Sequence, residues 1–145
     1  MVYNTLGTYA LNTNNPHEAR EYFSHMIELS KKGEDFGWRS TVAGELSEVE
    51  LSLGNIERAI EFGQEAVSHA RPGKPFYLGL TLNNLASYLV ADNRSHEARQ
   101  VAREGFQLVR EEGGVPVWMS LQLWAVLIAI AGRGERRCKD WWLCR

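Results

Sequence analysis

The chain repeats itself with a period close to 40 residues, and this repetition limits the possible folds more than any other feature. Three short segments align around Ala19, Ala59 and Ala98, which are 40 and 39 residues apart. An apolar stretch precedes each alanine, and a turn containing Asn or Gly separates the two. Self-similarity at a period of about 20–50 residues is typical of arrays in which each unit buries its apolar face against its neighbours. The sequence therefore predicts stacked units.

Each unit is predicted to be a pair of antiparallel helices, because its apolar residues recur at helical spacing and no stretch alternates with the period of a strand. A small alanine at the start of each second helix allows the two backbones to approach, and Leu6, Leu46 and Leu85 fill the space beside that crossing. Asn15 is expected to cap the second helix of the first unit, with Glu18 as its capping-box partner. Helices are predicted over about 2–13, 16–32, 35–53, 56–70, 76–91, 94–112, 117–132 and 135–144.

These residues resemble the tetratricopeptide repeat family. The family pattern of an aromatic residue, then Leu-Gly, then Ala-x3-Phe appears as Tyr3, Leu6-Gly7, Ala19 and Phe23. The period exceeds the family's by five or six residues, and this long variant looks like the helical repeat arrays of large bacterial signalling and transcription regulators. The resemblance implies an all-α fold, a right-handed superhelix of about three and a half repeats. Their limits are about 1–33, 34–73, 74–114 and, in part, 115–132, followed by a basic tail or short terminal helix over 133–145.

Charge argues against nucleic acid as a ligand. Residues 133–145 carry a net charge of +3, whereas the rest of the chain carries −5. Phosphate recognition needs a continuous basic surface, which an acidic body does not offer.

Neither a membrane span nor a secretory signal is expected. The most apolar run, residues 115–131, is 17 residues long, which is short of the about 20 that a bilayer requires. The first residues lack the pattern of a signal peptide, so the predicted location is the cytoplasm.

No motif in the sequence carries catalytic chemistry. Phosphate-binding glycine loops and nucleophile elbows are missing from it. Cys138 and Cys144 do not have the spacing of a zinc pair, and His17 and His96 are interpreted as polar residues of a first helical turn. We therefore expect no enzyme, no cofactor and no metal site.

The resemblance implies that the first helices of the units line a concave face that binds a protein or peptide. The matching positions are Asn4, Thr8, Gly44, Glu48, Asn83, Ser87, Trp124 and Ile128. Asn4 with Thr8, and Asn83 with Ser87, present the same amide–hydroxyl pair one helical turn apart, and amides can hydrogen-bond an extended peptide backbone. The alternative is that these short polar residues only solvate an unused groove. No lysine lies in these helices, so the lysine clamp by which some relatives hold a terminal carboxylate is not expected.

Two further hypotheses follow from the sequence. The chain could be a regulatory or sensor fragment of a larger bacterial ATPase-type or transcription regulator, without activity of its own. In addition, Leu121, Trp124 and Ile128 form an apolar stripe on the predicted helix 117–132, and no other part of the chain is obviously able to cover it. We expect this stripe to pair with a second copy about a two-fold axis, the alternative being that it packs against further repeats.

Overall fold

The computed structural model describes residues 2–30, 36–112 and 120–130. The described chain is helical apart from its turns and contains no strand, which confirms the all-α prediction. The helices are α1 (Val2–Asn12), α2 (Pro16–Ser30), α3 (Phe36–Ser52), α4 (Ile56–Ala70), α5 (Pro75–Ala91) and α6 (Ser95–Glu112), and residues 120–130 are also helical. The tail 133–145 and the helix predicted within it lie outside the described residues.

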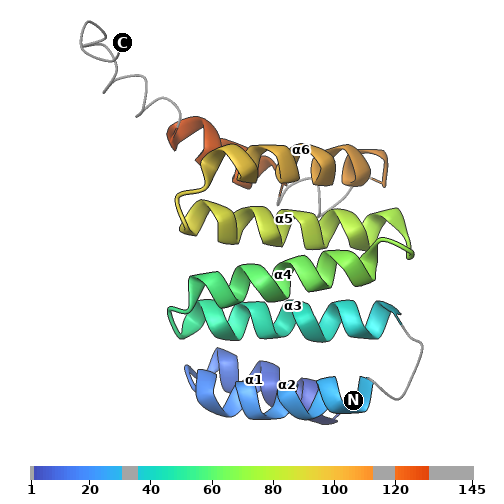
Figure 1. Cartoon of the computed structure of the whole chain (residues 1–145), viewed down its shortest axis with the longest axis vertical. Helices are drawn as coiled ribbons and strands as arrows, with labels where there is room; N and C mark the ends of the chain where they lie inside the picture. Colours follow the sequence, from blue (N-terminus) through green and yellow to red (C-terminus); the bar gives the residue numbers. More distant parts are fainter. Residues whose placement is uncertain (1, 31–35, 113–119, 131–145) are drawn as a thin grey trace, which may run out of the picture.

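The helices pack in chain order as a stack of antiparallel pairs. Each helix from α1 to α6 contacts the next one, and α3 also contacts α5. Figure 1 shows the pairs α1–α2, α3–α4 and α5–α6 following one another along the long axis of the molecule. Since contacts run between neighbours along the chain, the arrangement is that of a helical repeat array.

The three turns inside the pairs have the same backbone geometry. Asn14, Gly54 and Asn93 have positive φ angles of 61°, 79° and 60°. One residue later, an N–H donates a 2.8 Å hydrogen bond to the carbonyl five residues back, and the bonded pairs are Asn15 to Ala10, Asn55 to Glu50 and Arg94 to Leu89. This is the Schellman ending of a helix, in which glycine or asparagine tolerates the left-handed residue.

The expected capping box is not the device that forms these turns. The Asn15 side chain donates to the Thr13 hydroxyl, and the Glu18 carboxylate accepts a hydrogen bond from Tyr22. Asn55, at the equivalent turn, also makes no capping bond with its side chain. The connection is set by the left-handed residue, because it already pairs the last carbonyls of the first helix.

The small positions behave as predicted. Ala19, Ala59 and Ala98 are completely buried, and Leu46 and Leu85 are buried beside them. Leu6 differs, with 38% of its surface exposed. Within the described chain, α2 is the main packing partner of α1, and Leu6 remains partly in contact with solvent.

One substitution in the repeat pattern connects α5 to α3. In the first unit the Phe23 ring covers Gly7, where an added Cβ would lie 2.6 Å from Cζ of that ring. The second unit has Gly63 at the position of Phe23, and there the ring of Tyr88 from α5 lies over the glycine, 3.1 Å from an added Cβ. The missing side chain on α4 thus allows an aromatic residue of the next unit to reach across toward α3.

Candidate functional site

A groove of about 660 Å³ lies between the first helices of the second and third units. This volume falls within the range of about 300–1,000 Å³ that is usual for ligand-binding clefts. The exposed lining is mostly apolar, and it comes from α3, α5 and the end of α4 with the turn that follows it. We call it the α3–α5 groove.

One face of α3 forms the first wall. The lining residues of α3 follow one another at spacings of three or four, except for two neighbours in the middle. They are Trp38, Thr41, the neighbours Gly44 and Glu45, and Glu48. This spacing places side chains on one side of a helix. A Cβ built on Gly44 would meet no atom within 4 Å. The groove is therefore open at its middle because α3 has no side chain there.

The second wall belongs to α5, where Tyr77, Leu80, Thr81 and Asn84 line the groove. The Thr81 hydroxyl donates to the carbonyls of Tyr77 and Leu78 within its own helix, and Thr41 donates in the same way to the carbonyl of Gly37. The side-chain amide of Asn84 forms no hydrogen bond within the described chain. Asn84 thus offers both a donor and an acceptor to a ligand.

Two carboxylates lie at the far end of the groove. Glu48 accepts a 2.6 Å hydrogen bond from the Tyr88 hydroxyl, which crosses from α5 to α3. Burial raises the pKa of Tyr88 above its ordinary range, and the charge of Glu48 beside it acts in the same direction. Tyr88 therefore remains a neutral donor at physiological pH.

Glu45 is the carboxylate without a partner. It forms no ion pair or hydrogen bond with any other described residue. Partial burial raises the pKa of Glu45, and the charge of Glu48 one turn away raises it further. An unpaired carboxylate in a half-buried position loses hydration and gains no compensating contact, so a cation placed beside it would be stabilised.

The basic side chains of the groove lie at its opposite end. Lys74 immediately precedes α5, and His69 lies in the last turn of α4, with Nε2 3.5 Å from a carboxylate oxygen of Glu65. Glu45 lies more than two turns into α3, which runs alongside α5. The groove thus has a basic end at the start of α5 and an acidic end further along the two helices.

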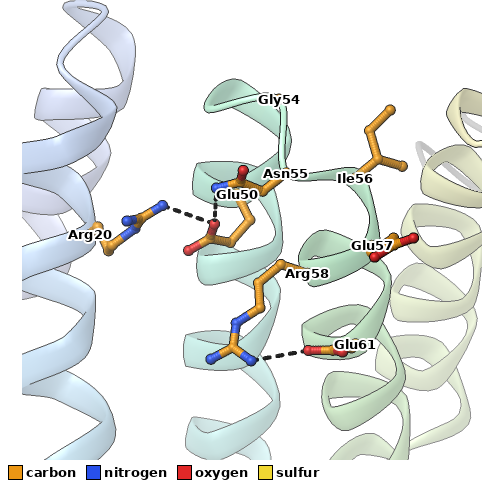
Figure 2. A pocket seen from close by; sticks show the side chains of 8 residues that line it. All are labelled: Arg20, Glu50, Gly54, Asn55, Ile56, Glu57, Arg58 and Glu61. Atoms are coloured by element: carbon orange, nitrogen blue, oxygen red, sulfur yellow. Dashed lines mark hydrogen bonds and ion pairs between the residues drawn. The ribbon is translucent and has the colours of Figure 1, made fainter.

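A second hollow of about 750 Å³ surrounds the turn between α3 and α4 (Figure 2). Four of its five charged side chains already form ion pairs with one another. Arg20 of α2 donates to Oε2 of Glu50 over 2.9 Å, the Asn55 amide donates to the same oxygen over 2.8 Å, and Arg58 pairs with Glu61 over 3.0 Å. Glu50 is buried, and its contacts with Arg20 and Asn55 connect α2 to the turn between α3 and α4. We therefore interpret these contacts as structural.

The residues predicted for partner binding lie in different places. Gly44 and Glu48 line the groove, and Ser87 is exposed outside it. Asn4 and Thr8 are half-buried on α1. Asn83 is only 3% exposed, and its amide donates a 2.5 Å hydrogen bond to the Ser120 hydroxyl. Asn83 thus lies at a contact between α5 and the helical segment 120–130, and the amide that reaches the groove belongs to the next residue, Asn84.

The three residues of the predicted self-association stripe also differ in their exposure. Leu121 and Ile128 are 55% and 67% exposed. Trp124 is half-buried and packs against the core cluster of α4, α5 and α6, which also contains Leu123 and Leu127.

The part of the chain that the structure describes contains no cluster of three His, Cys, Asp or Glu residues placed to hold a metal ion. Cys138 and Cys144 are not among these residues. No described helix combines the length and apolar character needed to cross a bilayer.

The stacked helix pairs define a helical repeat protein with a groove between successive first helices. Residues 78–112, which cover most of α5 and all of α6, match the model of the tetratricopeptide repeat family. The third helix pair thus matches the pattern of a tetratricopeptide repeat, in agreement with the resemblance found in the sequence. No curated protein matches the chain. Tetratricopeptide repeats typically serve as non-catalytic scaffolds for protein interaction.

Proposed function

We propose that this protein binds an extended peptide segment of a partner protein in the α3–α5 groove. The carrying observation is that the groove is open, mostly apolar and lined by an amide, Asn84, that has no partner within the described chain. Apolar walls supply burial, and a free amide hydrogen-bonds the peptide backbone without reading its sequence. The family match over α5 and α6 supports a role in protein interaction.

The experiment fills the groove at its open point. Gly44→Trp places a large side chain where a Cβ meets nothing, so the helix should fold while the groove is occupied. Random peptide pools passed over the immobilised protein should be retained by the original chain and released by Gly44→Trp. Gln64→Trp, an exposed position on α4, is the matched control and should bind like the original. Equal retention by all three proteins would exclude the groove.

A second proposal concerns self-association. Leu121 and Ile128 are exposed, whereas Leu123 and Leu127 on another face of the same helix are buried. Large apolar side chains that gather on one face mark interaction surfaces. We propose that Leu121 and Ile128, with the exposed part of Trp124, contact the same residues of a second copy.

A further inference from the structure

We infer that the segment bound in the α3–α5 groove carries an arginine or lysine next to an apolar residue, and that its cationic group pairs with Glu45 and Glu48. The inference rests on the proposed function, since it names the chemistry of the ligand for the same groove. Its basis is the placement of the charges along the groove.

The acidic end has an uncompensated negative charge. Glu48 is engaged by the Tyr88 hydroxyl, a neutral donor that leaves the carboxylate charge in place. Glu45, one turn earlier on the same face, has no cation beside it among the residues that the structure describes. Lys74 and His69 line the groove from its other end. Partial burial raises the pKa of Glu45, and repulsion between two carboxylates one turn apart, with no described cation beside them, raises it further.

The neighbouring walls suit the rest of such a ligand. Trp38, Tyr77 and Leu80 provide apolar surface between the two charged ends. An arginine or lysine side chain buries its methylene stem along apolar surface while its charged head reaches an acid. A planar guanidinium also forms paired hydrogen bonds to a carboxylate, so arginine fits this end best.

The arrangement disfavours acidic ligands at the same place. A ligand carboxylate beside Glu45 and Glu48 would add a third negative charge in a partly dehydrated groove, and like charges brought together there are costly. The charge of the lining residues therefore selects among peptides that all satisfy the apolar walls.

The test compares four peptide pools that differ only at a fixed central residue, which is Arg, Lys, Gln or Glu. The flanking positions are random, and the peptide ends are blocked so that terminal charges do not contribute. We expect the immobilised protein to retain the Arg and Lys pools about tenfold more than the Gln pool, and the Glu pool least. Raising the salt concentration should narrow this difference, because ionic contacts are screened.

The variants separate the charge effect from the groove itself. Glu45→Gln combined with Glu48→Gln should abolish the preference for Arg and Lys while the Gln pool is retained as before, since the glutamine at 48 still accepts from Tyr88. Glu57→Gln, an exposed position on α4, is the control for removal of one negative charge and should keep the preference. Helical circular dichroism checks that each variant is folded.

The outcomes distinguish the two proposals. If Gly44→Trp blocks retention of the pools, but the original protein shows no preference for a basic central residue, the inference is overturned. The proposal of a peptide-binding groove would still stand. A basic preference that persists in the double glutamine variant would also overturn it. If no pool is retained, or if Gly44→Trp retains all of them, the proposed function fails and the inference fails with it.

Discussion

The phenolic hydroxyl of Tyr88 donates a 2.6 Å hydrogen bond to a carboxylate oxygen of Glu48, a residue 40 positions earlier in the chain. That separation is one residue more than the 39-residue repeat between Ala59 and Ala98, so the bond joins the first helices of successive units. It exists because Gly63 on α4 leaves room for the tyrosine ring, which is 2% exposed. The contact orders the far end of the α3–α5 groove, and each partner has a separate role, since Tyr88 packs and Glu48 carries charge.

Replacing Tyr88 with phenylalanine should destabilise the protein by about 1–2 kcal/mol, because a buried donor to a charged acceptor is lost while the ring is kept. The free energy of unfolding, measured with urea, gives the value. Tyr77→Phe removes an exposed hydroxyl from the same helix and should leave the stability unchanged. Equal effects of the two substitutions would show that the bond to Glu48 contributes nothing.

Glu45→Gln should stabilise the protein at neutral pH, in contrast to its expected effect on binding. The folded-state pKa of Glu45 is raised above its ordinary value of 4.5. A group with a raised pKa favours the folded state when it is protonated, and this contribution is lost as the pH rises through the folded pKa. Glutamine stays neutral, so the advantage of the variant should be present at pH 7 and disappear below about pH 4.

Thermal unfolding across this pH range measures the effect, and Glu57→Gln on the exposed face of α4 is the control. A stability difference for Glu45→Gln that is the same at both ends of the range would contradict the prediction. If Glu45 lowers the stability of the folded protein and also improves peptide binding, it behaves as residues of ligand sites often do, because such sites retain charges that are unfavourable for folding.

The helix pairs, their turns and their small crossing residues could be predicted from the sequence, because each depends on local chemistry. Gly54 and Asn93 tolerate the left-handed turn conformation, and Ala59 and Ala98 are completely buried where the helices of a pair meet. These features repeat at the same spacing, so a single pattern defines them in all units.

The groove could be predicted only in part, because it depends on how two helices rotate against each other. The repeat pattern selected Asn83, whereas Asn84 reaches the groove and Asn83 is buried against Ser120. A shift of one residue turns a side chain by about 100° around a helix. Three pairs of lining residues, Trp38 with Tyr77, Thr41 with Leu80 and Glu45 with Asn84, do lie 39 residues apart at equivalent repeat positions, but the pattern alone does not show which helix face borders the groove.

Two glycines in helix interiors should respond in opposite ways to alanine. Gly44→Ala should stabilise the protein by about 0.5–1 kcal/mol, because alanine favours the helix and its Cβ meets no atom within 4 Å. Gly79→Ala should cost about 1–3 kcal/mol, since its Cβ would collide with the side chain of Val109 and approach the carbonyl oxygen of Gly105 to 3.2 Å. Urea unfolding of both variants compares them directly, and a gain at Gly79 would contradict the close approach of α5 to α6.

The apparent mass of the protein should rise with concentration if the helical segment 120–130 pairs with a second copy. A two-fold contact through Leu121 and Ile128 buries the exposed part of both residues in each copy, and these four side chains contribute about 4–7 kcal/mol before the cost of association. Light scattering across about a hundredfold dilution should show dimer giving way to monomer. Leu121→Glu with Ile128→Glu should stay monomeric throughout.

Trp124 is a poor position for this test because it packs against the core, and its replacement would disturb the fold. Gln122→Glu with Ala129→Glu adds the same charge at exposed positions of the same helix and is the matched control. Dimerisation of the control together with a monomeric stripe variant supports the contact, whereas an original chain that is monomeric at every concentration rules it out.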